Sequence, residues 1–189
     1  NASIGGTLAT NASGSRSYKF GVTRNFVNAV DCILADGRRV LVKRGHKITE
    51  PLLLDDGSEI EFPEIEYISP NCKNAAGYFI QPGMDWLDLF IGSDGTLGIF
   101  VNICLKLLPR PDDFISGILF FEREIFCWEL IPKIKSTNYV SPCSLEYFDR
   151  FSLELLREKY PNIPVQAEAA LFFEEDIAKQ KNYDFKRKV

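Results

Sequence analysis

The chain has 189 residues, of which 46% are hydrophobic and 25% are charged, and its formal net charge is -4. This length suits one domain plus part of another, and it is enough to bury a sizeable core. The acidic balance excludes a typical nucleic-acid binder, whose surface is basic. No apolar run reaches the ~18 residues that a membrane span requires.

The basic residues near the C-terminus and the cysteines exclude further kinds of site. A basic run near the C-terminus is interrupted by acids and aromatics and is interpreted as a solvated helix face; it comprises Lys179, Lys181, Lys186, Arg187 and Lys188. The cysteines are odd in number and contain no CxxC pair; they are Cys32, Cys72, Cys104, Cys127 and Cys143. We therefore expect no disulfide framework, no metal site and a reducing, cytoplasmic setting.

A glycine-bearing segment, residues 4–14, opens the chain. Gly5 and Gly6 permit a tight turn, in which backbone N–H groups can approach an anionic or planar ligand. Thr10, Asn11 and Ser13 add hydroxyl and amide groups. The segment equally suits a turn that opens a helix, with Asn11 and Ser13 as caps. It matches neither GxGxxG nor GxxxxGK(S/T), so neither a Rossmann fold nor a P-loop is indicated.

Two hairpins are predicted next. Each is an Asp-Gly pair between apolar runs, the strongest short-range hairpin signal; the strands and turns are 26–35, 36–37, 39–42, and then 52–55, 56–57, 58–62. The pattern indicates an antiparallel sheet. His46, the only histidine, lies between the hairpins in a basic stretch without a partner motif, and is interpreted as a solvated loop residue.

A short helix and a second glycine segment follow. Asp85 is a suitable N-cap for a helix whose apolar residues face inward at helical spacing; these are Trp86, Leu87 and Phe90. The segment Gly92-Ser93-Asp94-Gly95-Thr96-Leu97-Gly98-Ile99 then leads into a strand with one apolar face at period two; this face comprises Ile99, Val101, Ile103, Leu105 and Leu107. The glycines suit either a ligand contact or a β-bulge at the start of the strand.

Residues 109–113, Pro-Arg-Pro-Asp-Asp, have the composition of a domain boundary. Beyond them the pattern predicts strand, helix, strand, helix and strand, which is the start of an α+β module; the ranges are 115–121, 124–135, 143–148, 152–159 and 166–173. Pro132 is expected to strain or kink the first helix. We therefore divide the chain into residues 1–110 and 111–189.

The first glycine segment is followed by Tyr18-Lys19-Phe20-Gly21 and Thr23-Arg24. With these residues and Lys73-Asn74-Ala75-Ala76-Gly77-Tyr78, the two glycine segments resemble FAD-linked oxidases of the vanillyl-alcohol oxidase type. This group contains glycolate oxidase and D-lactate dehydrogenase flavin subunits. The resemblance runs from about Ser3 to Pro111 and is weaker beyond. It implies an α+β fold: a second FAD-binding subdomain with an antiparallel or mixed sheet and flanking helices, followed by the start of a ferredoxin-like cap domain.

The resemblance also implies which residues contact FAD. In the first segment these are Ser3, Gly5, Gly6, Thr10, Asn11, Ala12, Ser13 and Gly14, and in the second Asp94, Gly95, Thr96, Leu97, Gly98 and Ile99. Asp94 departs from the usual Glu of the family. Lys73 and Asn74 would place a cation and an amide near the flavin. Tyr78 is either a hydrogen-bond donor to the substrate or, as we favour, a buried structural tyrosine.

The resemblance implies a parent protein that oxidises a 2-hydroxy acid or related alcohol by hydride transfer to FAD. We expect the chain to be a fragment without the N-terminal FAD subdomain, unable to retain FAD alone, and we assign no catalytic residue. The expected partners are a small-molecule substrate, the missing subdomain and an electron-acceptor protein. The alternative is a noncatalytic nucleotide-binding or interaction module that keeps the fold.

Overall fold

The structure is a computed structural model that describes residues 2–177; the basic run of residues 179–188 lies outside them. The chain forms two compact units. Unit 1 contains the residues up to Ser13 and Val22–Leu108, and unit 2 contains Gly14–Gly21 and the residues from Pro109 onward. That residues 1–110 belong to an FAD-binding domain and residues 111–189 to a cap domain stays a prediction.

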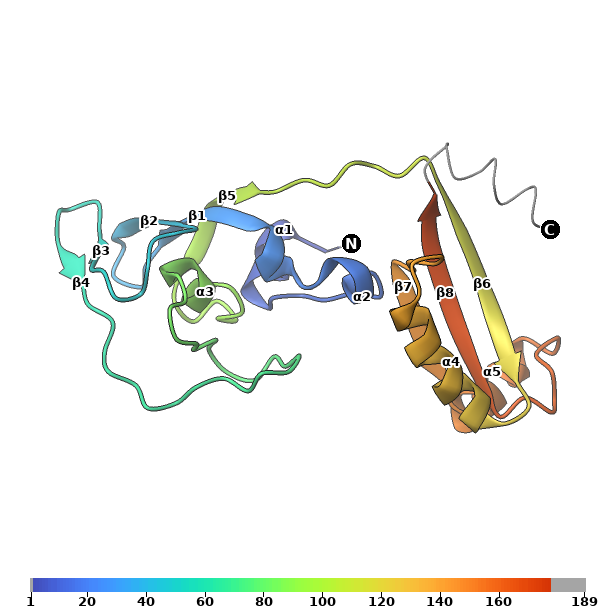
Figure 1. The fold of residues 1–189 in the computed structure, drawn as a ribbon. Helices are drawn as coiled ribbons and strands as arrows, with labels where there is room; N and C mark the ends of the chain where they lie inside the picture. Colours follow the sequence, from blue (N-terminus) through green and yellow to red (C-terminus); the bar gives the residue numbers. More distant parts are fainter. Residues whose placement is uncertain (1, 178–189) are drawn as a thin grey trace. The chain divides into compact units, whose positions relative to one another are not determined.

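Unit 1 has short helices and antiparallel strands; they are α1 (Ile4–Ala9), the 3-10 helix η1 (Thr23–Phe26), β1 (Val27–Ile33), β2 (Arg39–Lys43), β3 (Leu52–Leu53), β4 (Glu59–Ile60), α3 (Trp86–Phe90) and β5 (Ile99–Leu105). Its main sheet has the order β2-β1-β5, and β3 pairs with β4 (Figure 1). All pairs are antiparallel. Both predicted hairpins are confirmed, with Gly37 and Gly57 at positive φ.

Helix α3 contributes its apolar face to the core of unit 1. Trp86, Leu87 and Phe90 are all buried, as the helical spacing predicts. Asp85 precedes the helix, and the Asp88 carboxylate accepts the N–H of Asp85 at 3.1 Å, as in a capping box. The helix is therefore fixed both by its apolar face and by the polar groups at its start.

Strand β5 departs from the predicted pattern. Ile99 is 69% exposed, whereas Phe100 packs against the core. Cys32 of β1 pairs with Phe100. The preceding residue, Asp31, pairs with Asn102, so β5 contains one extra residue, a β-bulge. The bulge reverses the alternation of side chains, and the single inward face predicted for this strand is therefore wrong.

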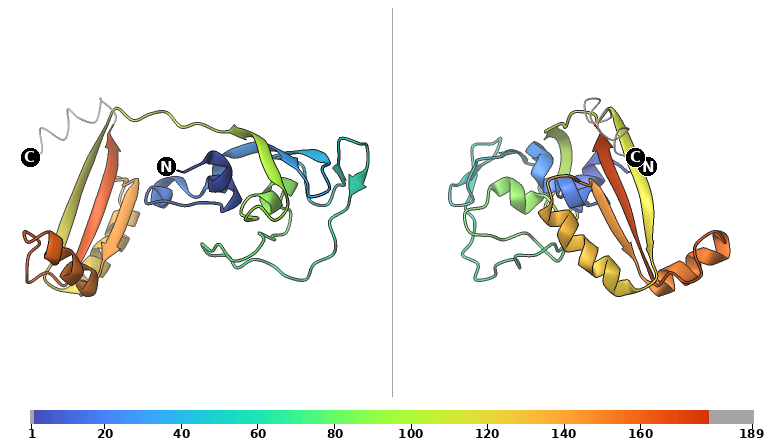
Figure 2. Two further views of the ribbon diagram at one scale, coloured as in Figure 1. Left: turned by 180° about the vertical axis from the view of Figure 1, so that it is seen from behind. Right: turned by 45° about the vertical axis from the view of Figure 1, so that its right-hand side comes forward.

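Up to Ile177, where the described residues end, unit 2 has one three-stranded antiparallel sheet and three helices; they are α2 (Ser17–Phe20), β6 (Asp113–Phe121), α4 (Glu124–Ser136), β7 (Ser144–Phe148), α5 (Arg150–Lys159) and β8 (Ala169–Ile177). The sheet order is β6-β8-β7, and Figure 2 shows β8 between its two neighbours. This is a split β-α-β unit, the arrangement that begins a ferredoxin-like fold. The predicted α+β class and element order are confirmed.

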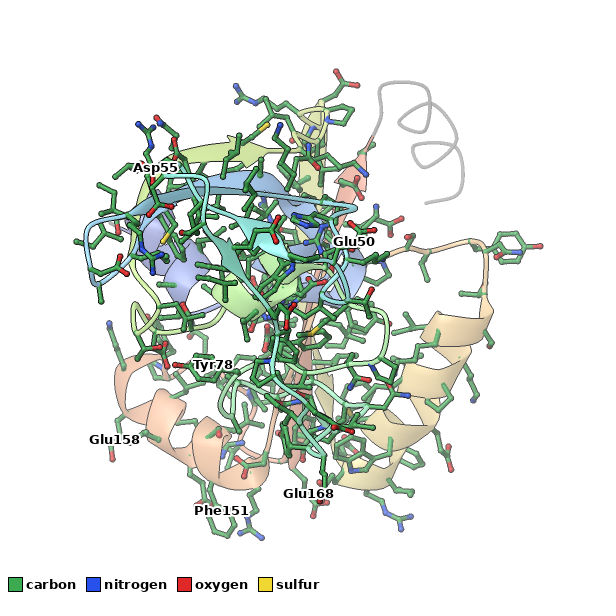
Figure 3. All side chains as sticks on the ribbon, turned by 90° about the vertical axis from the view of Figure 1, so that its left-hand side faces the viewer. Glu50, Asp55, Tyr78, Phe151, Glu158 and Glu168 are labelled. Carbon is green, nitrogen blue, oxygen red and sulfur yellow. The ribbon has the colours of Figure 1, made fainter. Side chains whose placement is uncertain are left out.

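The two longer helices of unit 2 cover opposite faces of this sheet. Cys127 of α4 packs with Ala169 and Leu171, whereas Leu153 of α5 packs with Ala170. Successive residues of a strand point to opposite faces, so α4 and α5 lie on different sides of β8. The outer side of α5 stays open to solvent: Phe151 is 76% exposed and points away from the helix in Figure 3.

Among the described residues, none of the helices is long and apolar enough to cross a membrane. The same residues contain no group of three or more His, Cys, Asp and Glu that could hold a metal ion.

Candidate functional site

Four separate segments of the sequence line one small hollow in unit 1, of about 160 Å³. We call it the Asn11 hollow; its lining residues are Thr10, Asn11, Arg24, Asn74, Ala75, Ala76, Gly77, Phe79, Gly92 and Asp94. Both glycine segments and the Asn74–Gly77 motif contribute to it. The fold thus brings together the three motifs on which the resemblance rests.

The backbone at this hollow adopts unusual conformations. Asn11 and Asp94 are the two non-glycine residues at positive φ in the described part of the chain, at 47° and 52°. Asn and Asp tolerate this left-handed region better than other residues, yet it remains costly and concentrates at functional sites. The N–H of Asp94 donates to the carbonyl of Ala9 at 2.8 Å, so the two loops hold each other.

Gly92 fits closely beside Asn11. Its φ is +85°, and a Cβ there would lie 3.2 Å from the Cβ of Asn11. Its N–H donates to the carbonyl of Leu8 at 3.1 Å, close to the end of α1. Both the backbone conformation and the space therefore favour glycine at this position.

Arg24 lines the hollow and is held in place by hydrogen bonds to the α3 region. Its Nη1 donates to Asp88 Oδ1 at 3.1 Å, and its Nη2 donates to the carbonyl of Ile91 at 2.6 Å. Its guanidinium lies 4.2 Å above the ring of Phe79. Burial lowers the pKa of Arg24 more than Asp88 raises it. Because arginine stays charged at any ordinary pH, the hollow has a fixed cation beside it.

A wider ion-pair network supports this arginine. Arg44 Nη1 lies 2.7 Å from Asp88 Oδ1 and 3.4 Å from Asp85 Oδ2, and Lys47 Nζ lies 2.8 Å from Asp85 Oδ1. Burial of Asp85 opposes ionisation, but the N–H of Gly45 and the ammonium of Lys47 outweigh it, so the pKa of Asp85 lies below its ordinary value. With Arg24, three cations share two carboxylates, which leaves the network positive.

The groups that remain for a ligand are mostly side chains. The N–H groups of Thr10, Asn11, Gly92 and Asp94 all donate to carbonyls of the protein. In the described part of the chain, Nδ2 of Asn11 and the carboxylate of Asp94 form no hydrogen bond. The hollow thus offers an amide donor, a carboxylate and a nearby cation. Its volume is below the ~300–1,000 Å³ of complete ligand pockets, so it fits one edge of a larger polar ligand.

The predicted residues of the first segment are divided between several roles. Ser3 caps α1, and its Oγ accepts the N–H of Gly6 at 3.1 Å. Gly5 and Gly6 lie within the helix, so the backbone turns at Asn11 and not at the two glycines. The predicted caps, Asn11 and Ser13, do not open this helix. Of the two interpretations of residues 4–14, the one that includes a helix is closer to the structure, although Ser3 is the residue that caps it.

The remaining residues of this segment are not part of the lining of the hollow. The carbonyl of Ala12 accepts hydrogen bonds from Thr23, whereas Ser13 is exposed and Gly14 belongs to unit 2. Only Thr10 and Asn11 of the first segment line the hollow.

In the second segment, several residues stabilise the fold. Thr96 Oγ1 donates to the carbonyl of Ser93 at 2.5 Å, and the hydroxyl of Tyr78 lies 2.6 Å from the same Thr96 atom. Leu97 packs against the core, whereas Ile99 is exposed. Since Thr96 donates to Ser93, the Tyr78 hydroxyl donates to Thr96, which ties the Tyr78 loop to this segment.

The glycines of the second segment differ in their surroundings. Gly98 has φ +153°, and a Cβ would lie 2.4 Å from the carbonyl oxygen of Ile33 and 2.6 Å from Cys32 Sγ. This glycine is required by the close approach of β1. Gly95 has φ +76° with no atom within 4 Å of an added Cβ, so it is required only by its turn. Contact of either residue with flavin stays a prediction.

Sequence reasoning left Arg24, Phe79 and Gly92 out of the predicted site. Gly92 belongs to the second glycine segment and Arg24 to the stretch after the first, so the resemblance included both residues without assigning them to the site. Phe79 carried no signal of its own, because only the folded chain places its ring beneath a guanidinium. Lys73 is exposed and does not line the hollow, and His46 contacts the carbonyl of Pro51 in a loop, as expected of a loop residue.

Comparisons with known proteins agree with these motifs. The model of a family described as "FAD binding domain" matches residues 1–43. The D-lactate dehydrogenase of Anaerostipes hadrus is 31% identical over 79% of this chain and 25% of its own length. The glycolate oxidase subunit GlcD of Bacillus subtilis is 30% identical over 92% of this chain and 30% of its own length. The chain thus spans at most 30% of these two relatives.

A solved structure of alkyldihydroxyacetonephosphate synthase has a TM-score of 0.61 with 17% sequence identity, over 97% of this chain and 30% of that one, which shows likeness of fold. Together, the matches confirm that the chain is similar to the FAD-linked oxidases of the glycolate oxidase and D-lactate dehydrogenase type.

Proposed function

We propose that the Asn11 hollow is part of an FAD site in a flavoprotein that oxidises a 2-hydroxy acid. The observation that carries the proposal is that three separate motifs, each typical of FAD-linked oxidases, line one hollow with two strained non-glycine residues. The names of the two relatives support the substrate class, since lactate and glycolate are both 2-hydroxy acids.

FAD, when bound, supplies the acceptor for a hydride. The residues of this chain would bind and orient it. The amide of Asn11 is available as a donor, and the glycine at 92 lets the loops approach closely. The fixed charge of Arg24 favours an electron-rich ligand edge. In this proposal the substrate-contacting groups, the remainder of the FAD site and an electron-acceptor protein come from outside the hollow, in a cytoplasmic protein.

A pair of glycine variants tests the site. Gly92→Ala and Gly37→Ala introduce the same methyl group at nearly the same φ, +85° and +88°, but only the first meets other atoms within 4 Å. In the full-length protein we expect Gly92→Ala to lose most of its flavin absorbance and Gly37→Ala to keep it. Equal flavin content in the two purified variants would contradict the assignment of the hollow.

The substrate class is tested by anaerobic titration of the full-length protein. A panel of 2-hydroxy acids is expected to bleach the flavin without added nicotinamide. If the acids leave the flavin oxidised and a reduced nicotinamide bleaches it, the protein is a reductase. If the protein holds a nucleotide and no donor bleaches any flavin, it is a noncatalytic nucleotide-binding module.

A further inference from the structure

Residues 14–21 leave unit 1 and return to it within a few residues. We call this segment the strap. Its two ends are tied together in unit 1, where the carbonyl of Ala12 accepts the Thr23 hydroxyl at 2.7 Å and the Thr23 N–H at 3.3 Å. Next to them, Asn11 Oδ1 accepts the N–H of Arg24 at 3.0 Å. These four residues form the neck of the strap.

The neck and the Asn11 hollow share residues. Asn11 and Arg24 belong to both. The Asn11 side chain is oriented by its bond to Arg24 N–H, and this bond leaves Nδ2 as the amide donor toward the hollow. A change in the neck therefore changes the direction of the group that we propose contacts FAD.

The middle of the strap is attached to the sheet of unit 2, the unit to which the strap itself belongs. Arg16 Nε lies 2.6 Å from Glu174 Oε1, and the Arg16 guanidinium lies 4.3 Å above the ring of Phe114. Lys19 forms an ion pair with Asp176. The hydrogen bond from Arg16 lowers the pKa of Glu174. Two neighbouring strands, β6 and β8, thus contribute to the attachment.

The strap has little structure of its own to replace these contacts. Its helix, α2, has four residues, and a single turn is not stable in water without tertiary packing. Gly14 and Gly21 at its ends allow the backbone wide freedom. The conformation of the strap, and of the residues joined to its ends, therefore depends on its attachment to strands β6 and β8.

We propose that Arg16 and Lys19 are positioning residues: by attaching the strap to strands β6 and β8, they order the neck and so the Asn11 side chain at the proposed FAD site. The ordering of the neck is a property of the protein itself. Only its consequence for FAD rests on the proposed function.

The test is hydrogen exchange of the peptides that carry the Thr23 and Arg24 amides, in the full-length protein. The variants are Arg16→Glu, Glu174→Arg and the double charge swap. Arg150→Glu is the matched control, since Arg150 forms a comparable exposed ion pair with Glu154 within α5 and does not contact the strap. We expect each strap variant to speed exchange in the neck about two- to fivefold, and the double swap to restore slow exchange, as for a modest surface pair.

Unchanged exchange in Arg16→Glu, or an equal increase in the control, would overturn the proposal. An increase that the double swap fails to reverse would also overturn it, because the effect would then not depend on the ion pair. A parallel titration with FAD separates the two proposals. If the wild-type protein binds no FAD while exchange follows the pattern above, the proposed function fails and the role of the strap in ordering the neck stands.

Discussion

Replacement of Gly98 by alanine is expected to destabilise unit 1 strongly. The added Cβ would lie 2.4 Å from the carbonyl oxygen of Ile33 and 2.6 Å from Cys32 Sγ, with φ at +153°. Ordinary contacts between heavy atoms are about 3.5–4.0 Å, so β1 and β5 would have to separate by about 1 Å. Overpacking of this kind costs about 1–3 kcal/mol. Backbone strain at such a φ adds about 1–3 kcal/mol.

The matched control is Gly95→Ala, in the same turn. Its φ is +76°, and no atom lies within 4 Å of the added Cβ, so only the backbone strain of about 1–2 kcal/mol applies. Both variants thus carry backbone strain, and only Gly98→Ala adds the close contact with β1. We expect Gly98→Ala to be the less stable by about 1–3 kcal/mol, a sizeable part of the about 5–15 kcal/mol typical of a folded domain.

Urea unfolding followed by tryptophan fluorescence measures this difference. The chain has two tryptophans, and Trp86 is buried in unit 1 whereas Trp128 in unit 2 is 48% exposed. In a Trp128→Phe background, the signal reports unit 1. Equal losses of stability in the two glycine variants would refute the argument. If Gly98→Ala is much less stable, its flavin loss would not identify a ligand contact, and Gly92 remains the better position for that test.

Three further predictions follow from the same structure. The isolated 189-residue chain is expected to purify without stoichiometric flavin, because the hollow of about 160 Å³ fits only an edge of the ligand; a full flavin spectrum of the purified chain would contradict this. Asp85 has a lowered pKa in the folded state, so its contribution to stability is present above the unfolded pKa of about 4 and is lost as the pH falls through the lower folded value. Asp85→Asn should therefore lower stability at pH 7 by about 1–3 kcal/mol and much less at pH 2, as denaturation at the two pH values can measure; an equal loss at both would argue against it. Limited proteolysis is expected to cut within residues 109–113 before it cuts β5, since the chain there has no strand or helix before β6 and is mostly exposed; first cleavage inside β5, mapped by mass spectrometry, would be inconsistent with this.

Much of the local structure could be predicted because it depends on neighbouring residues. The Asp-Gly pairs fix their hairpins through positive φ at Gly37 and Gly57. Asp85 and the apolar spacing after it fix α3. The strand and helix order of unit 2 follows from the same kind of short-range pattern. The bulge in β5 could not be predicted, because it is a property of the register between β1 and β5 and not of either sequence alone.

In the candidate site, too, some features follow from neighbouring residues and others from contacts between distant segments. The sequence by itself determined the residue types, since small, amide and glycine residues in this order are typical of an FAD-linked oxidase. It also determined the hairpin turns at Gly37 and Gly57, but not the turn at Asn11, which was predicted at Gly5 and Gly6. The tertiary structure decided which of these residues meet: it placed Thr10, Asn11 and Asp94 in one hollow and held Gly98 against β1. It also assigned residues 14–21 to unit 2. The physical reason is that contacts between distant segments depend on how whole elements pack, which no local spacing contains.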